Sequence, residues 1–226
     1  MAESVNAKRP YDSPRRRAQA AATRRDILDA ARRLFERNGY AATTMEAIAS
    51  EAGVALKTAY VAFETKSGLL RALWNHLLRG GHDELPVAQQ PWYLEALDEP
   101  HPERQLRLVA RYSRINKLRI AATFEVIRNA ATIDPEIHAL WRRIQTEFHA
   151  NQRTVIDSLN DKGALAPGID ADRATDILWT LNHPDLWQLL VTERGWTPEQ
   201  YEQWCADTAC TQLLRANAPR TRPKRT

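Results

Sequence analysis

The stretch "MEAIASEAGVALKTAYVAFETKSGLL", residues 45–70, decides the fold of the chain. Thr43, just before it, and Glu46, inside it, form a capping-box pair that predicts the start of a short helix. Gly53 can adopt the left-handed backbone conformation that ends such a helix. A second apolar run follows from Val54. The stretch therefore predicts two short helices joined by a turn.

The spacing inside this stretch is that of a helix-turn-helix unit. Such a unit needs a small residue where its helices cross and a turn glycine four residues later, and Ala49 and Gly53 meet both needs. The positions expected to face inward are all small or apolar. They are Ile48, Ala52, Val54, Ala59 and Ala62. Lys57, Thr58 and Tyr60 are left on the outward face, where they are candidate contacts to DNA. An alanine-rich pair of helices that only packs is the alternative.

Helical patterns fill the rest of the chain. Thr23 begins an apolar stripe that stops at Gly39, and residues 67–79 continue as a helix after the quoted stretch. Residues 103–131 are apolar on more than one side, which indicates one buried helix or two in sequence. Further helices are predicted over 134–163, over 170–193 with an interruption at Pro184, and over 197–216. There is no strand pattern of any length, so the predicted fold class is all-α.

Basic residues gather at the two ends of the chain, which has a formal net charge of +4. Residues 1–25 and 215–226 are rich in Lys and Arg, whereas residues 71–214 hold more acidic than basic side chains. A mildly acidic body with basic arms suits a partner that is a polyanion. Basic tails that are only solvated are the alternative interpretation.

No pattern for a metal site, a cofactor or a catalytic centre is present in the sequence. The six histidines lack paired metal-ligand spacing with one another or with Cys205 and Cys210, and there is no glycine-rich phosphate loop or nucleophile elbow. The two cysteines lie five positions apart in a helical stretch, a poor geometry for a disulfide, so both are expected to be reduced. Without a secretory signal or an apolar run of about 18 residues, we expect a soluble cytoplasmic protein with no membrane partner.

The segment from Thr23 to Leu70 resembles the DNA-binding domain of the TetR family of transcriptional regulators. That family usually has a Ser at the start of the recognition helix, then Thr-Leu-Tyr, a His-Phe pair and a Lys that begins the fourth helix. The corresponding residues are Ala55, Thr58, Ala59, Tyr60, Ala62, Phe63 and Lys66. Three alanines depart from the family pattern. Ala55 cannot cap its helix, and Ala62 removes a polar group, so the operator preference of relatives cannot be transferred.

The resemblance implies further contacts to the DNA backbone. Thr44, at the start of the second helix, and Lys66, at the start of the fourth, are carried over as phosphate contacts. Arg24 and Arg25 are expected to lie along the backbone or in the minor groove, and a solvated tail is the alternative for them.

The three outward residues of the recognition helix have distinct expected partners. Lys57 suits a phosphate or the acceptor edge of guanine, and Thr58 suits a thymine methyl or a phosphate. Tyr60 suits a phosphate oxygen through its hydroxyl, and a half-buried aromatic without a DNA contact is the alternative.

The resemblance also implies a larger helical domain whose last two long helices form a four-helix dimer interface. Here those helices are expected over 170–193 and 197–216, so a homodimer is predicted. The candidate interface residues are Leu178, Leu181, Trp187, Leu190, Tyr201, Cys205 and Leu213. Packing within one chain is the alternative for them.

The same domain commonly encloses an effector pocket in this family. Candidate walls are aromatic residues of the predicted helices and one polar break in their apolar stripe. They are Tyr112, Phe124, Trp141, Phe148, Trp179 and Asn151. An ordinary apolar core is the alternative for any one of them. The aromatic walls predict a bulky, apolar or aromatic effector, and residues 67–79 are expected to couple the pocket to the DNA reader.

The predicted organisation has four parts. A basic flexible arm (1–22) precedes a helix-turn-helix DNA-binding domain (23–66), which is followed by a helical effector-binding and dimerisation domain (67–216) and a basic flexible tail (217–226). The predicted function is a transcriptional regulator, a repressor released from a palindromic double-stranded DNA operator by a small hydrophobic or aromatic effector. Two alternatives stay open: a helical protein-interaction or RNA-binding module with basic tails, and a cofactor-free helical enzyme.

Overall fold

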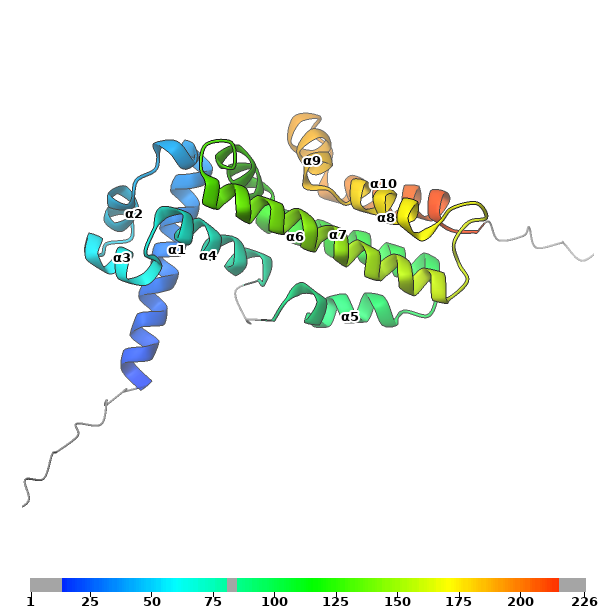
Figure 1. Ribbon diagram of the computed structural model, residues 1–226, viewed down its shortest axis with the longest axis horizontal. Helices are drawn as coiled ribbons and strands as arrows, with labels where there is room; N and C mark the ends of the chain where they lie inside the picture. Colours follow the sequence, from blue (N-terminus) through cyan, green and yellow to red (C-terminus); the bar gives the residue numbers. More distant parts are fainter. Residues whose placement is uncertain (1–13, 81–84, 216–226) are drawn as a thin grey trace, which may run out of the picture. The chain divides into compact units, whose positions relative to one another are not determined.

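The computed structural model describes residues 14–80 and 85–215 of the 226-residue chain (Figure 1). Within these ranges the regular secondary structure is helical, and the strand-like pairing is confined to one isolated bridge between Leu165 and Leu214. The predicted all-α fold is therefore confirmed. None of the helices in these ranges combines the length and the apolar character that a membrane span requires. The chain divides between Leu73 and Trp74 into two compact units.

The first unit contains three helices and the start of a fourth. They are α1 (Pro14–Ala42), α2 (Met45–Glu51), α3 (Leu56–Phe63) and α4 (Lys66–Leu78). The apolar stripe of α1 supplies much of the core, to which α2 adds Met45, Ile48 and Ala49 and α3 adds Ala59 and Phe63. Ile27, Ala30, Ala31, Phe35, Ile48 and Ala59 have no exposed surface. Of the positions predicted to face inward, Ile48 and Ala59 are buried and Ala52, Val54 and Ala62 are half-buried, and Met45 and Phe63 are buried in addition.

The first helix is longer than its sequence pattern indicates. It begins at Pro14 and not at Thr23, so residues 14–22 of the predicted flexible arm are helical. Alanine and arginine are strong helix formers, which explains a helical start without a buried face. Gly39, with φ 76° and ψ 170°, interrupts the helical backbone where a stop is predicted. Residues 1–13 of the arm and the predicted tail (217–226) lie outside the described residues.

The connection from α3 to α4 is a tight turn with a strained residue. Glu64 has φ 63° and ψ −52°, and the amide of Thr65 donates to the carbonyl of Phe63 over 2.7 Å, which closes a γ-turn. This conformation is rare for a residue with a side chain. Gly68 is needed in the next turn, because a Cβ there would lie 2.5 Å from the Phe63 carbonyl oxygen. The start of α4 is thus held against the end of α3.

The second unit is a helical bundle. After the last residues of α4 it contains a short 3-10 helix (Val87–Gln89), α5 (Pro91–Asp98), α6 (Pro102–Ala130), α7 (Pro135–Asp161), α8 (Ala171–Leu181), α9 (Pro184–Trp187), a π-helix (Gln188–Glu193) and α10 (Pro198–Leu213). The long helices α6 and α7 run side by side, α10 packs against α6, and α8 packs against α7 (Figure 1). Residues 102–130 are a single helix, which decides between the two possibilities left by the sequence.

The predicted interruption at Pro184 places a polar turn inside the second unit. Proline has no backbone N–H and cannot continue α8, which ends at Leu181. His183 begins α9, and its Nδ1 accepts a hydrogen bond from the amide of Asp185 over 3.2 Å. The turn therefore places Asn182 and His183 between α6 and α7, where Asn182 bonds Gln152 and the His183 ring contacts Phe124.

Candidate nucleic-acid interface and internal cavity

Four side chains are exposed on α3. Lys57 and Thr58 are exposed, Tyr60 is 42% exposed and Val61 is 76% exposed, whereas Ala59 is completely buried. The structure thus brings the predicted Lys57, Thr58 and Tyr60 together on one short helix. Sequence reasoning missed Val61, because a valine within an apolar run is usually buried. Because Ala59 is packed against the core, Val61, two positions further along the helix, lies on the outward side.

Two of the predicted DNA contacts hold the first unit together. The Lys66 ammonium donates to the carbonyls of Tyr40 and Thr43, each over 2.9 Å, and lies 4.2 Å from the centre of the Tyr40 ring. Arg24 donates to the Ala62 carbonyl over 2.6 Å. Its guanidinium also lies 4.1 Å from the centre of the Phe63 ring. These contacts join α4 to the end of α1 and join α1 to α3, so both cations position α3.

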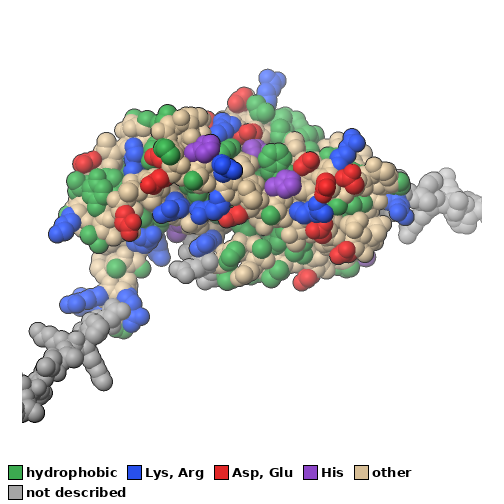
Figure 2. Space-filling model, in the orientation of Figure 1, with side chains coloured by type: hydrophobic (Ala, Val, Ile, Leu, Met, Phe, Trp, Pro, Cys, Tyr) green, Lys and Arg blue, Asp and Glu red, His purple; other side chains and the backbone are tan. Residues whose placement is uncertain are grey.

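The remaining candidates of the first unit lie at helix starts or on the surface. Thr44, and not Thr43 as the capping-box pattern predicts, caps α2, since its hydroxyl oxygen accepts a hydrogen bond from the amide of Ala47 over 3.1 Å. The Thr43 hydroxyl instead donates to the carbonyl of Gly39 over 2.8 Å. Arg25 is exposed on α1. Ala55 begins α3 without a side-chain cap, as its chemistry requires. Exposed arginines also cover the N-terminal end of α1, at residues 15–17 (Figure 2).

The second unit encloses a cavity of about 580 Å³. Four of the six predicted wall residues line it: Tyr112, Phe124, Phe148 and Asn151. Trp141 and Trp179 do not, which corrects the sequence-based prediction. Trp141 packs behind Phe124, with ring centres 4.9 Å apart, and Trp179 packs on His183 at 5.0 Å. Both tryptophans are half-buried outside the cavity wall, because helical periodicity identifies an apolar face but not which of its side chains reach a cavity.

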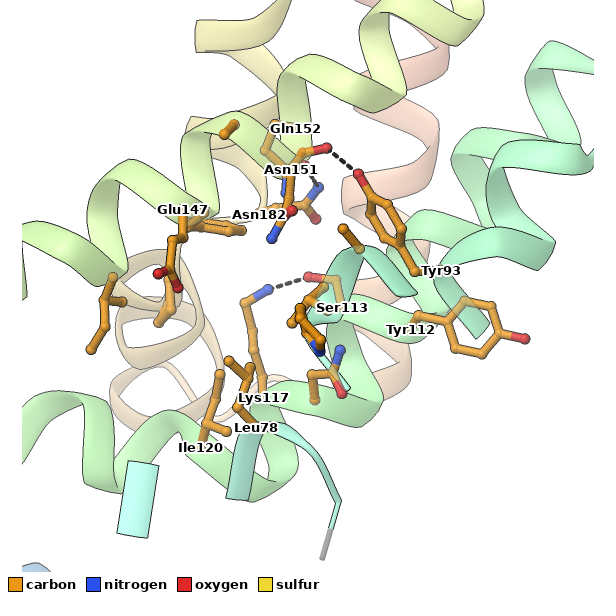
Figure 3. Close-up of a pocket in the computed structure, with 18 of the residues that line it drawn as sticks. Leu78, Tyr93, Tyr112, Ser113, Lys117, Ile120, Glu147, Asn151, Gln152 and Asn182 are labelled. Carbon is orange, nitrogen blue, oxygen red and sulfur yellow. Dashed lines mark hydrogen bonds between the residues drawn. The ribbon is translucent and has the colours of Figure 1, made fainter. Parts of the chain in front are cut away.

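Tyr112 lines the cavity with only part of its side chain. Its hydroxyl donates to a carboxylate oxygen of Glu95, and Figure 3 shows the ring pointing away from Lys117. The hydrogen bond to Glu95 raises the pKa of the Tyr112 hydroxyl. Tyr93, which lies on α5 together with Glu95, is buried and donates from its hydroxyl to the Asn151 carbonyl over 2.6 Å. Tyr112 therefore belongs to the outer edge and Tyr93 to the inner wall.

Polar wall residues form the part of the site that the sequence did not indicate. Ser113, Asn116 and Lys117 of α6 line the cavity together with Gln152 and Asn182. The amide nitrogen of Asn182 donates to the side-chain oxygen of Gln152 over 3.1 Å. A signal was available, because positions 113, 116, 117, 120 and 124 share one face if residues 102–130 are a single helix. Because the sequence left open whether these residues form one helix or two, this shared face was not identified.

Lys117 is the charged group in the interior wall. It is 3% exposed, its ammonium donates to the Ser113 hydroxyl, and it lies 5.2 Å from the centre of the Tyr201 ring. Burial lowers the pKa of Lys117 to about 8. In Figure 3 its side chain points across the cavity toward Asn151 and Asn182.

The predicted dimer residues are placed mainly in the core of one chain. Leu178, Leu181, Trp187, Tyr201, Cys205 and Leu213 are all less than 9% exposed, and Leu190 is partly buried against the cluster around Trp187. Their packing within the chain accounts for their apolar character. A dimer through α8 and α10 would use other side chains on the outward faces of these helices.

The described residues contain no group of His, Cys, Asp and Glu side chains that could hold a metal ion. Cys205 and Cys210 are both free thiols. Burial raises the pKa of both thiols, so neither is a reactive thiolate.

Comparison with family models identifies the first unit. Residues 27–73 match the model described as "Bacterial regulatory proteins, tetR family". This match favours a DNA-binding regulator over the helical enzyme and the interaction module that the sequence left open. No match was found among curated proteins.

Solved structures share the fold over most of the chain. The repressor SmeT of Stenotrophomonas maltophilia, in complex with triclosan, is 21% identical, with a TM-score of 0.68 over 91% of this chain and 99% of that chain. NalD of Pseudomonas aeruginosa is 20% identical, with a TM-score of 0.66 over 87% and 98%. A TetR transcription regulator from Haloarcula marismortui is also 20% identical, with a TM-score of 0.64 over 86% and 100%. At these identities the likeness establishes the fold.

Proposed function

We propose that this chain is a transcriptional regulator of the TetR family and that it represses transcription from a palindromic operator. A small molecule in its cavity then releases it from the DNA. One observation carries the DNA-binding part of this proposal. The α3 helix presents Lys57, Thr58, Tyr60 and Val61 outward, while Arg24 and Lys66 hold it in place from α1 and α4.

The exposed residues of α3 have the chemistry of base and phosphate recognition. Lys57 suits the acceptor edge of guanine or a phosphate, and Tyr60 suits a phosphate oxygen. Thr58 and Val61 are three positions apart and lie on adjacent turns, so their methyl groups suit the methyl of thymine. Thr44 and Arg25 are proposed as flanking phosphate contacts. Lys66 and Arg24 are proposed to act first by positioning α3, because their cations already bind carbonyl groups.

A homodimer supplies what one short helix lacks. Two readers on one face of DNA require half-sites about 34 Å apart, and a palindromic operator offers them. Regulators of this family dimerise, and we propose the outward faces of α8 and α10 as the contact in this chain. The seven residues predicted from sequence then contribute mainly by packing inside the second unit, and two of them, Trp187 and Leu190, lie in α9 and the π-helix.

The α4 helix is the proposed link between effector and operator. Lys66 begins it in the first unit, and Trp74, Asn75 and Leu78 of its second half line the cavity. An effector that favours a different arrangement of this half changes the position of Lys66 and of the helix that it holds. The effector lowers operator affinity only if it binds one of the two arrangements more tightly. That SmeT is seen with triclosan supports an organic effector for a protein of this fold.

A gel-shift titration with duplex DNA from the upstream region of the gene tests the proposal. Tyr60→Ala is expected to weaken binding about 5- to 50-fold, because a phosphate contact in the complex is lost, with no change in thermal unfolding. The affinity of the wild type should fall steeply as salt is raised from about 50 to 200 mM.

A matched control removes exposed positive charge outside the first unit. Arg142 is exposed on α7, and Arg142→Ala should leave operator affinity within about twofold of the wild type. If Tyr60→Ala binds as tightly as the wild type, or if Arg142→Ala weakens binding equally, the assignment of α3 as the reader is wrong.

A further inference from the structure

The charges of the cavity are unevenly distributed between its interior and its mouth. Lys117 is 3% exposed, whereas the other charged wall residues, Arg79, Arg143 and Glu147, are exposed or half-buried. Glu147 lies 3.8 Å from Arg143, and its side chain is 64% exposed. The Glu147 carboxylate is therefore paired with Arg143 at the mouth, while the interior holds the Lys117 cation.

No carboxylate pairs with Lys117 among residues 14–80 and 85–215. The contacts of its ammonium are the Ser113 hydroxyl and the face of the Tyr201 ring, both uncharged. A buried ammonium without an anion is costly, and a hydroxyl and a ring offset only part of that cost. The cavity wall thus holds a positive charge on Lys117 that no negative charge of the described residues balances.

The neighbouring titratable groups do not supply the anion. Burial raises the pKa of Tyr201 and of the Cys205 thiol, both on α10, so the two side chains are neutral near pH 7. Burial lowers the pKa of His183, in the turn before α9, so its imidazole is neutral near pH 7 and supplies no negative charge. Asp185, beside His183, forms an ion pair with Arg128 over 2.6 Å. The negative charge must come from outside the chain.

We propose that the effector is an amphipathic organic acid whose carboxylate pairs with Lys117 and Ser113 while its apolar body lies against the aromatic wall of the cavity. This inference rests on the proposed function and narrows it from a hydrophobic effector to a hydrophobic acid. The apolar side of the wall is formed by Trp74, Phe124, Phe148, Ile120 and Val155. The volume of about 580 Å³ lies in the range that accommodates drug-sized ligands.

The pairing predicts a pH dependence of binding with a definite sign. The carboxylate of the ligand is ionised throughout the neutral range, and in the complex it raises the pKa of Lys117 above the value of about 8 in the free protein. The complex then holds a proton that the free protein loses above pH 8. Affinity for the acid is therefore constant below pH 8 and falls as the pH rises above it, by at most tenfold per pH unit.

The experiment compares acids with their neutral amides in the full-length protein. Isothermal titration calorimetry with decanoate against decanamide, and with naphthylacetate against naphthylacetamide, holds the apolar body constant and changes only the charge. The acids are expected to bind the wild type about 30-fold more tightly than the amides and to lose that advantage in Lys117→Met. Arg143→Gln is the control for charge at the mouth, and it should keep most of the preference.

The outcomes separate this inference from the proposed function. Acid preference that disappears in Lys117→Met, while that variant still binds the amides, supports the inference. The inference is overturned if the wild type binds the amides as tightly as the acids or more tightly. It is also overturned if Arg143→Gln loses the acid preference as fully as Lys117→Met does, or if none of the four probes binds. The proposed release from DNA is tested separately, since it fails only if no apolar compound, neutral or acidic, changes operator affinity in the gel shift.

Discussion

Lys66 and Lys117 illustrate how differently the two units use the same side chain. The Lys66 ammonium binds two backbone carbonyls at 2.9 Å and joins the start of α4 to the end of α1 and to the loop before α2. The Lys117 ammonium lies in the cavity wall of the second unit, against a hydroxyl and an aromatic ring. Carbonyl oxygens satisfy a buried cation, whereas a hydroxyl and a ring satisfy it only partly. The first lysine therefore maintains the fold, and the second is available for a ligand.

Replacement of Lys66 is expected to have the largest effect. Lys66→Met removes two charge-assisted hydrogen bonds and leaves two carbonyls without their donor, which should lower the free energy of unfolding of the first unit by about 3 kcal/mol. Operator binding should be lost with it. All seven tryptophans lie beyond residue 73, so the loss should be visible in far-UV circular dichroism, with little change in tryptophan emission.

Lys57→Met is the matched control for this comparison, because Lys57 is an exposed lysine of the same unit. It should weaken operator binding without a measurable change in stability. If both variants destabilise the first unit equally, Lys66 has no special structural role.

Replacement of Lys117 should act in the opposite direction. Lys117→Met removes a buried cation and keeps most of the side-chain volume, so the second unit should be at least as stable as in the wild type at pH 7. Because the folded pKa of about 8 lies below the ordinary value of 10.5, the unfolded chain binds more protons between these pH values. The stability of the wild type should therefore rise from pH 8 to 10.5 relative to the variant, by at most about 3 kcal/mol.

Denaturant unfolding monitored by tryptophan emission at several pH values measures this difference. A stability difference between wild type and Lys117→Met that does not change with pH would show that Lys117 is not buried as a cation. The premise of the effector proposal, a buried cation in the cavity wall, would then be wrong.

The smallest effect is expected at the turn that holds the start of α4. Glu64 has φ 63°, a backbone conformation that glycine adopts without strain, so Glu64→Gly should stabilise the first unit by about 1 kcal/mol. The corresponding control is Glu51→Gly at the end of α2, where the residue has a helical backbone and its carboxylate pairs with Arg33 over 3.0 Å, so that glycine is unfavourable. Thermal unfolding followed by circular dichroism should show shifts of opposite sign, and a lower midpoint for Glu64→Gly would mean that its side chain contributes more than its strain costs.

The sequence determined the helix-turn-helix unit because its information is local. The glycine at 53 and the small residue at 49 each act within one or two turns, and Ile48 and Ala59 are buried as that spacing predicts. The cap of α2 is displaced by one residue from the predicted Thr43 to Thr44. The outward position of Lys57, Thr58 and Tyr60 follows from the same periodicity. The placement of Lys66 and Arg24 does not follow, because their partners are carbonyl groups of other helices.

Only the tertiary structure decided which side chains form the cavity. Periodicity identified Phe124, Phe148 and Asn151 but could not distinguish them from Trp141 and Trp179, which lie on the same kind of apolar face but outside the cavity wall. A lysine in a helix is usually solvated, so no local pattern marks Lys117 as buried. Its burial depends on α10 covering α6, a contact between residues far apart in the chain, and the physical reason is that burial is a property of packed helices and not of any one of them.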